Sequence, residues 1–531
     1  MIQGRPGAAA SSGKKQCGKN AAERAGETMG EQFDLVIIGG GPAGYTAAVE
    51  AAGKGMKTAL IENRELGGTC LNRGCIPTKT ILHAAQQYHE AKHMDAYGIH
   101  AEAVSCDMGG IQAYKADVVR QLQDGIGMLM KKNKVTVFQG TGTIVGPHEV
   151  RVTERTEEAD TADAPKCEAG NENTQNGNVQ NGNAQNENTQ NEYTLLADYV
   201  LIATGSLPSM APIPGTDLDG VLDSDAILAS DRQYPRLTIV GGGVIGMEFA
   251  SIYSALGAQV TVIEFLDRIL ANMDREISQN LKMILKKRGV DIHTGAGVEQ
   301  IERAQDGSLV CRYKEKDVRK TVVSDAVLIA TGRHANTEGL FDAQVQQAFV
   351  MDRGRIVVNA YGQTSVPNVY AVGDVTPGIQ LAHAASSQGI NAVAHMVYSR
   401  AHAHEDAAKT GFVSPMRTDL IPGCVYTDPE IGSIGITQDE AKAQGIPVLI
   451  RKYPMSANGK SVLTRQERGF IKVVADEASH KILGAQMMCA RATDMISEFG
   501  TAIVNGLTLE QMASVVRPHP TFSEGITEAV R

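Results

Sequence analysis

Residues 33–44 read FDLVIIGGGPAG, an apolar run that leads directly into a glycine-rich turn. Such a run predicts a short buried strand. Gly39, Gly41 and Gly44 have the spacing Gly-x-Gly-x-x-Gly, which permits a tight turn, close approach of the backbone to a pyrophosphate and close packing of the next helix. Glu62 ends a second apolar strand, TALIE, 23 residues after Gly39, where a carboxylate can accept hydrogen bonds from ribose hydroxyls. Together these features predict a dinucleotide-binding unit, with glycines in an unrelated loop as the alternative.

The same pattern occurs a second time, at residues 236–246, as RLTIVGGGVIG. Gly241, Gly243 and Gly246 repeat the glycine spacing, and Glu264 closes the strand VTVIE at the same 23-residue offset. An internal repeat of this kind indicates two related supersecondary units. The chain is therefore predicted to bind two dinucleotides.

Each unit also ends on the same sequence, DYVLIATG at 198–205 and DAVLIATG at 325–332. Both are apolar strands that stop at Ala-Thr-Gly. Thr204 and Gly205 in the first unit, and Gly332 in the second, are candidate cofactor contacts.

The second unit is predicted to prefer NAD over NADP. A carboxylate at Glu264 would repel the 2′-phosphate of NADP, and no cluster of arginines follows it, since Arg268 is the nearest basic residue.

The most specific motif is GGTCLNRGCIPTK at residues 67–79, which places Cys70 and Cys75 five positions apart. In a regular helix their Cα atoms would lie about 8.6 Å apart, beyond the ~7 Å that a disulfide can bridge. The segment is therefore expected to be distorted, and Gly74 permits such a distortion. A zinc site is excluded, because no second pair of cysteines or histidines accompanies this one. Two buried thiols without redox activity are the alternative.

GGTCLNRGCIPTK resembles the redox-active signature of the pyridine nucleotide-disulfide oxidoreductases, and the resemblance covers residues 33–531 apart from an Asn-rich insertion. It implies an α/β fold with two Rossmann-like dinucleotide-binding domains, one for FAD and one for NAD, and a C-terminal α+β dimerisation domain. The expected boundaries are 1–31 for a disordered extension, 32–222 for the FAD-binding domain with a disordered insertion at 154–192, 223–337 for the NAD-binding domain, 338–409 for a second part of the FAD-binding domain, and 410–531 for the dimerisation domain.

The resemblance also implies roles for residues near the flavin. Cys70 matches the thiol that exchanges with the substrate, and Cys75 matches the thiolate that contacts the flavin. Asp374, in YAVGDV, matches a contact to the ribityl or phosphate part of FAD. Lys79 and Glu248 match an ion pair beside the flavin ring, although a pair on a helix surface is the alternative.

The C-terminal motif RPHPTFSE, at residues 517–524, carries a candidate acid/base couple. His519 precedes a proline, which favours an extended backbone and a projecting imidazole. Thr521 and Glu524 also fit a helix capping box, so Glu524 taken alone would more often be a cap. The resemblance instead implies that Glu524 orients His519 and that His519 reaches the cysteine pair of the other subunit, so that activity requires a homodimer.

The activity implied by the resemblance is oxidation of dihydrolipoamide by NAD, with lipoyl groups presented by a 2-oxo acid dehydrogenase complex or the glycine cleavage system. Glu264, the spelling GCIPTK, the stretch VYTDPEIGSIG and HPTFSE favour this activity within the family. Two features depart from the family pattern: Arg517, where many members have another histidine, and MMCARATDMI at 487–496. The alternatives are an NAD(P)H-dependent reductase of another disulfide and a redox-inert FAD/NAD-binding scaffold.

Composition restricts the class of protein. The 531 residues exceed what a single core usually serves, so three or four domains are expected. A net charge of -10 argues against a nucleic-acid surface. No stretch is apolar enough for a membrane span, and the first thirty residues have no signal-like apolar run, so a cytoplasmic protein is expected. The other cysteines lack metal-ligand spacing and are expected to be reduced thiols: Cys17, Cys106, Cys167, Cys311, Cys424 and Cys489.

The segment 154–192 contains an Asn/Gln/Gly repeat with too few apolar groups to offset the entropy of ordering. Strand-like sequences flank it, VTVFQGTGTIV at 135–145 and YTLLADYVLIATG at 193–205. The segment is therefore predicted to extend one hairpin loop. Met29 is an alternative start of the protein.

Overall fold

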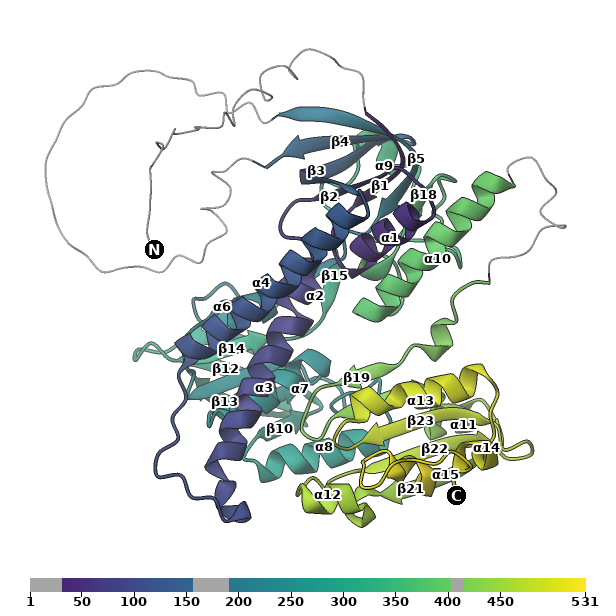
Figure 1. The fold of residues 1–531 in the computed structure, drawn as a ribbon. Helices are drawn as coiled ribbons and strands as arrows, with labels where there is room; N and C mark the ends of the chain where they lie inside the picture. The colour runs from purple at the N-terminus through teal and green to yellow at the C-terminus, as the bar shows by residue number, and fades with distance from the viewer. Residues whose placement is uncertain (1–30, 156–190, 403–413) are drawn as a thin grey trace, which may run out of the picture.

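The computed structural model describes residues 31–155, 191–402 and 414–531 (Figure 1). Within these ranges no helix is both long and apolar enough to cross a membrane. Residues 1–30 of the predicted N-terminal extension and nearly all of the predicted Asn-rich insertion lie outside the described residues.

The first nucleotide-binding unit is built on a six-stranded mixed sheet. Its central strand β1 is buried over most of its length and pairs in parallel with β2 on one side and β5 on the other. Parallel strands covered on both faces need near-continuous apolar sequence, which FDLVII and TALIE supply. Helices α1 and α10 pack against each other beside the sheet (Figure 1). The elements are β1 (Gln32–Ile38), α1 (Pro42–Gly53), β2 (Thr58–Glu62), β3 (Thr136–Gly146), β4 (Glu149–Glu154), β5 (Glu192–Ile202), β18 (Val369–Ala371) and α10 (Ala382–Ala401).

The predicted hairpin around the insertion is present, but its strands are β4 and β5. The stretch at 135–145 belongs to β3, which pairs with β4 on its other side. Glu154 ends β4 and Glu192 begins β5, so the two end residues of the predicted insertion belong to strands. β4 was missed because its sequence EVRVTE is short and half charged.

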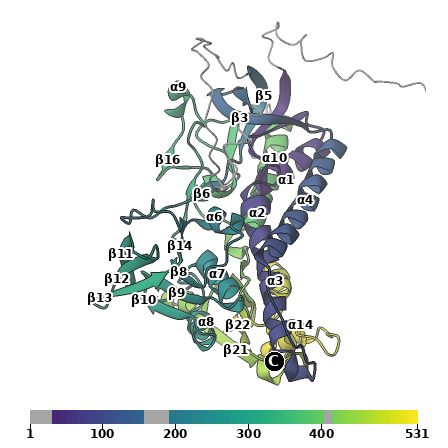
Figure 2. The ribbon, with the colours of Figure 1, turned by 90° about the vertical axis from the view of Figure 1, so that its left-hand side faces the viewer.

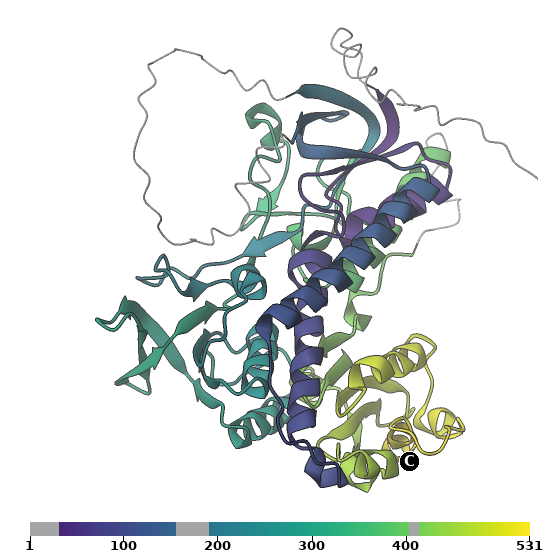
Figure 3. The same cartoon turned by 60° about the vertical axis from the view of Figure 1, so that its left-hand side comes forward.

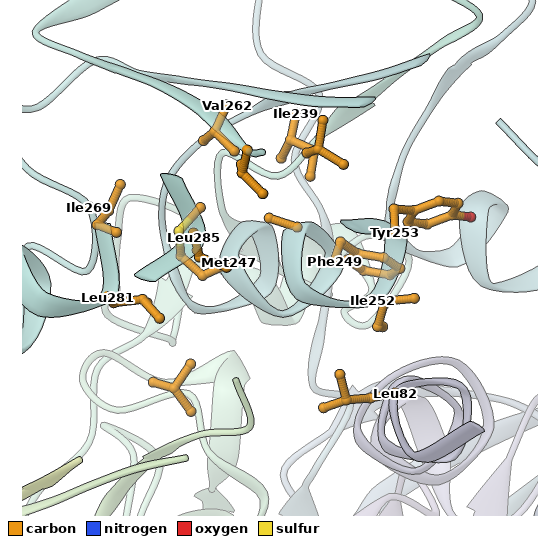
Figure 4. Close-up of a cluster of buried hydrophobic side chains, with 14 of the residues drawn as sticks. Leu82, Ile239, Met247, Phe249, Ile252, Tyr253, Val262, Ile269, Leu281 and Leu285 are labelled. Carbon is orange, nitrogen blue, oxygen red and sulfur yellow. The ribbon is translucent and has the colours of Figure 1, made fainter. Parts of the chain in front are cut away.

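The second unit has a five-stranded sheet in which every pairing is parallel, in the order β10-β9-β8-β14-β7. Figure 4 shows its core, where helix α7, which carries Met247, Phe249 and Ile252, lies between Ile239 and Val262 of the central strands on one side and Leu82 of the long helix after the cysteine motif on the other. The elements are β7 (Val221–Leu222), α6 (Ser224–Ala229), β8 (Arg236–Val240), α7 (Val244–Ala255), β9 (Gln259–Glu264), α8 (Arg275–Lys287), β10 (Asp291–Thr294), the antiparallel meander β11 (Ala296–Arg303), β12 (Leu309–Glu315) and β13 (Val318–Ser324), and β14 (Ala326–Ile329).

The C-terminal part is an antiparallel five-stranded sheet, in the order β19-β20-β23-β22-β21, with helices packed against it. This arrangement confirms the C-terminal α+β domain that the family resemblance implies. Its elements are β19 (Gly423–Val425), β20 (Ile431–Gly435), α11 (Gln438–Ala443), β21 (Val448–Pro454), η4 (Met455–Ala457), α12 (Gly459–Leu463), β22 (Phe470–Asp476), β23 (Ile482–Met488), α13 (Ala492–Val504), α14 (Leu509–Ala513) and α15 (Glu524–Val530).

Two long helices, α3 (Cys75–Lys92) and α4 (Met108–Lys132), connect the parts of the molecule (Figures 2 and 3). α3 leaves the first unit and packs against α7 of the second, and Leu82 faces that helix in Figure 4. Beyond its C-terminal end, the hydroxyl of Tyr97 donates a hydrogen bond of 3.1 Å to the carbonyl of Thr464 in the C-terminal part. Helix α3 and the short segment that follows it therefore contact all three parts of the chain.

Short elements complete the description: α2 (Gly68–Arg73), η1 (Met94–Tyr97), β6 (Ser206–Pro208), β15 (Arg333–Ala335), α9 (Ala343–Gln346), β16 (Met351–Asp352), β17 (Arg355–Ile356), η2 (Gly373–Val375) and η3 (Thr418–Leu420).

Candidate active site

A large cavity of about 1860 Å³ is lined by residues of both nucleotide-binding units and of the C-terminal part. Both glycine-rich turns line it, and so do Cys70 and Cys75. Tyr426 and Thr493 contribute the wall from the C-terminal part. Most of the residues predicted from the sequence are thus brought to one continuous space.

Both glycine-rich turns have the close contacts that require glycine. Gly39 has a φ of +107°, and a Cβ there would lie 2.3 Å from the carbonyl oxygen of Ala203. A Cβ at Gly44 would lie 1.8 Å from the carbonyl oxygen of Gly39, because α1 packs closely on the turn. In the second unit Gly241 has a φ of +113°, and a Cβ at Gly246 would lie 2.0 Å from its carbonyl. Side chains are therefore excluded at these four positions.

The middle glycine of each turn faces open space instead. A Cβ at Gly41 would come no nearer than 3.8 Å to another residue, and one at Gly243 would meet nothing within 4 Å. Each residue precedes the first turn of a helix, where backbone N–H groups lack intrahelical partners. Both turns therefore offer an open cradle of donors suited to a pyrophosphate.

The acidic residue of each unit lies beside its turn. Glu62 accepts hydrogen bonds from the backbone N–H of Gly40, at 2.7 Å, and of Arg64, at 2.8 Å. Burial raises the pKa of the Glu62 carboxyl despite these bonds. Glu264 makes the equivalent bond to the N–H of Gly242. Both carboxylates line the cavity, at the position expected for contacts to a ribose.

The helical segment that carries the cysteine motif is interrupted at Gly74, the predicted position. Helix α2 ends at Arg73 and helix α3 begins at Cys75, with Gly74 between them. A Cβ at Gly74 would lie 2.9 Å from the carbonyl oxygen of Thr69, so the two helices meet too closely for a side chain at this position. The expected distortion is confirmed, and it leaves Cys75 open to the cavity.

The two thiols differ strongly in acidity. A hydrogen bond from the Cys70 thiol, together with the positive charge of Lys79, lowers the pKa of Cys75 to about 7, although burial acts in the opposite direction. The same hydrogen bond and burial raise the pKa of Cys70. Cys75 is also the first residue of an 18-residue helix, whose N-terminus favours negative charge. Near neutral pH the reduced pair therefore holds its negative charge on Cys75.

Lys79 and Glu248 form the predicted ion pair, with 2.7 Å between Nζ and Oε2. Glu248 is only 3% exposed, so this is not a pair on a helix surface. The backbone N–H of Tyr426 donates to Oε1 of Glu248 at 3.0 Å, and Nζ of Lys79 lies 4.7 Å from the centre of the Tyr426 ring. The pair therefore joins α3, α7 and the segment after β19, which belong to three different parts of the chain.

Asp374 lies in η2 and lines the cavity on the side of the first unit. The Ser206 hydroxyl donates to its Oδ2 at 2.6 Å, and Nε of Arg333 donates to that hydroxyl at 2.8 Å. The sequence analysis missed Ser206 and Arg333. Each residue directly follows an Ala-Thr-Gly motif, but neither belongs to a recognisable spacing pattern. The predicted contacts Thr204, Gly205 and Gly332 also line the cavity.

Gln380 was likewise missed, and no motif marks it. It lines the cavity, and its Nε2 atom is buried without a hydrogen-bond partner in the described part of the chain. A buried amide of this kind is costly unless a partner completes it. The glycine cradles and this free donor therefore fit a polar cofactor that carries a pyrophosphate and a hydrogen-bond acceptor. His383, expected to be structural or exposed, is exposed at the cavity wall, with Nε2 2.9 Å from the carbonyl of Pro422.

His519 and Glu524 form the predicted couple, with 2.9 Å between Nδ1 and Oε1. The other carboxylate oxygen accepts the N–H of Thr521 at 2.8 Å, and these two contacts lower the pKa of Glu524, the backbone contact first. Ser523, not Thr521, precedes helix α15, so the expected capping box is only half formed. The His519 side chain is 79% exposed and does not line the cavity of its own chain.

Comparison with known proteins gives concordant results. Residues 33–389 match the family model described as pyridine nucleotide-disulphide oxidoreductase, and residues 421–530 match the dimerisation domain of that family. A dihydrolipoyl dehydrogenase of Bacillus subtilis is 39% identical over 94% of this chain and 98% of the relative. The mitochondrial dihydrolipoyl dehydrogenase of Pisum sativum is 35% identical over 95% of this chain and 92% of the relative.

Solved structures show the same fold. The HOCl-induced flavoprotein disulfide reductase RclA of Escherichia coli superposes with a TM-score of 0.75 at 27% identity, over 94% of this chain and 99% of that chain. LpdA of Mycobacterium tuberculosis superposes with a TM-score of 0.78 at 24% identity, over 94% and 99%. The predicted fold class is therefore confirmed: two Rossmann-like units and a C-terminal α+β domain.

Proposed function

Because this chain belongs to the pyridine nucleotide-disulphide oxidoreductase family, we propose that it is a dihydrolipoyl dehydrogenase that uses Cys70 and Cys75 as its redox pair. Relatives with this activity are 35–39% identical over nearly the whole chain. The observation that carries the assignment of residues is the acidic thiol of Cys75, held at the first turn of α3 between the two nucleotide cradles. The family uses FAD and NAD.

The residues around the cavity suit these two cofactors. The first cradle, with Glu62 and Asp374, would hold FAD, and the second, with Glu264, would hold NAD. When bound, FAD and NAD supply the path by which two electrons leave the cysteine pair. Glu264 disfavours a 2′-phosphate, which supports NAD over NADP as the coenzyme.

The cysteine pair acts in its disulfide form. A thiolate of the dihydrolipoyl substrate attacks Sγ of Cys70, the Cys70–Cys75 bond breaks, and Cys75 leaves as a thiolate. Its pKa of about 7 and the nearby Lys79 make Cys75 a good leaving group near neutral pH. The second substrate thiol then attacks the mixed disulfide, which releases the cyclic disulfide product and a Cys70 thiolate that takes up a proton. Two protons leave the substrate in all.

His519 accepts the proton from the attacking substrate thiol, and Glu524 orients its imidazole. We assign His519 to the cysteine pair of a second subunit; its exposed side chain, which does not line the cavity of its own chain, supports this assignment. The match of residues 421–530 to a dimerisation domain supports this homodimer. We further propose that the substrate is a protein-bound lipoyl group of a 2-oxo acid dehydrogenase complex or of the glycine cleavage system, in the cytoplasm.

The test measures NADH formed from dihydrolipoamide and NAD by the FAD-loaded protein. Cys70→Ser and Cys75→Ser should each abolish the reaction. Cys106→Ser should not, because Cys106 lies outside the cavity. Activity that survives in both Cys70→Ser and Cys75→Ser would overturn the assignment. A wild type that reduces another disulfide with NADPH, and leaves dihydrolipoamide unchanged, would establish the alternative reductase.

A further inference from the structure

The loop between α14 and α15 carries His519, and one of its side chains points inward while its neighbours point out. Val516 is 95% exposed and the His519 side chain is 79% exposed, whereas the Arg517 side chain is only 4% exposed. A long charged side chain is almost never buried without partners. The burial of Arg517 therefore needs an explanation in its contacts.

The guanidinium of Arg517 binds groups on three sides. Nη2 forms an ion pair with Oε1 of Glu498 on α13. Nη1 donates to Oγ1 of Thr527 on α15 at 2.6 Å, and it lies 3.4 Å from the carbonyl of Met512 and 3.3 Å from that of Val515, at the end of α14. Nε has no partner among the described residues. One side chain thus joins the three helices that surround the loop.

These contacts restrain both members of the acid/base couple. His519 follows Arg517 by two residues, and Glu524 begins the helix on which Thr527 lies one turn further on. A planar guanidinium has several donors in a fixed geometry, so it restrains the directions of its partners as well as their distances.

We propose that Arg517 is a positioning residue that holds the His519 loop against α13 and α15, so that the imidazole and Glu524 keep the geometry needed for proton transfer. The inference rests on the proposed function, because it assigns Arg517 a role in the dithiol half of that reaction. Arg517 does not line the cavity, so it contacts neither cofactor site.

The experiment compares two reactions of the FAD-loaded dimer. Oxidation of dihydrolipoamide by NAD needs His519, whereas reduction of ferricyanide by NADH needs no proton transfer by His519. Arg517→Lys keeps the positive charge but loses the planar guanidinium with its several donors. Thr527→Val removes the hydrogen bond of 2.6 Å from Nη1 of Arg517, with little change in side-chain shape. Arg312→Lys, in an exposed ion pair on β12, is the matched control.

We expect Arg517→Lys to lower kcat for dihydrolipoamide by about tenfold to a hundredfold, because small misplacements of a catalytic group have effects of this size. KM and the ferricyanide rate should stay unchanged, Thr527→Val should show a smaller loss of the same kind, and Arg312→Lys should show none. Equal losses in both reactions, or unchanged kcat in both Arg517→Lys and Thr527→Val, would overturn the inference. A wild type that reduces ferricyanide but does not oxidise dihydrolipoamide would overturn the proposed function itself.

Discussion

Lys79 and Glu248 lie 2.7 Å apart although they come from different nucleotide-binding units. Their pair fixes the first turn of the cysteine helix against the second unit, and it places a positive and a negative charge near Cys75. Lys79 lowers the pKa of Cys75 and Glu248 raises it, so the two residues set the acidity of this thiol in opposite directions.

Replacement of Lys79 by Met should raise the pKa of Cys75 above its value of about 7. The ammonium stabilises the thiolate, so its removal favours the protonated thiol. The pH dependence of iodoacetamide alkylation of the reduced protein measures this pKa, and the midpoint should move to higher pH. Lys92→Met, at the exposed far end of α3, is the control. A midpoint that is equal in the Lys79→Met and Lys92→Met proteins would show that Lys79 does not set the acidity.

Replacement of Glu248 by Gln should have the opposite effect on Cys75, because a charge that raises its pKa is lost. The same substitution leaves Lys79 beside a buried neutral group and should lower the free energy of unfolding by about 1–3 kcal/mol. Alkylation and urea denaturation measure the two effects. An alkylation midpoint that moves to higher pH would contradict the assigned sign.

Substitution of Gly44 by Ala should prevent assembly of the first cradle, because its Cβ would lie 1.8 Å from a backbone oxygen. The FAD content of the purified protein and its thermal midpoint should both fall sharply. Gly53→Ala is the matched control, since Gly53 lies in the same helix and its Cβ would meet nothing within 4 Å. If the Gly44→Ala protein retains full FAD content, the close packing of α1 on the turn is not required for binding.

Glu264→Gln should weaken the preference for NAD over NADP. The carboxylate is repelled by a 2′-phosphate, whereas an amide is not. The ratio of kcat/KM for NAD to that for NADP should fall by about tenfold, equivalent to about 1.4 kcal/mol. The ratio for an Arg268→Lys protein should stay near that of the wild type, because the Arg268 guanidinium binds the carbonyl of Ala271. An unchanged ratio in Glu264→Gln would assign the preference to other residues.

Local sequence was sufficient to predict the turns of this fold. Glycine is required at Gly39 and Gly44, and the helix is interrupted at Gly74, because of contacts within a few residues or with the adjacent strand. Such local requirements leave a recognisable spacing of glycines in the sequence. The pairing of Lys79 with Glu248 spans 169 positions and was predicted through family resemblance alone. The catalytic roles and the exact domain boundaries stay predictions.

Other parts of the site leave no pattern in a single sequence. Ser206, Arg333 and Gln380 reach the cavity because distant segments pack together, and none belongs to a spacing motif. The contacts of Arg517 depend on three helices that meet only in the folded chain. Such residues are determined by tertiary packing, which periodicity and spacing do not describe.

The two glycine turns and their carboxylates, Glu62 and Glu264, are close copies of each other. FAD and NAD share an adenosine diphosphate half, and a glycine-rich turn of this kind contacts only that half of the ligand. Copies so similar cannot by themselves tell the two coenzymes apart. Discrimination must come from the opposite end of each ligand, where the cavity wall of the first unit carries the thiols and that of the second does not.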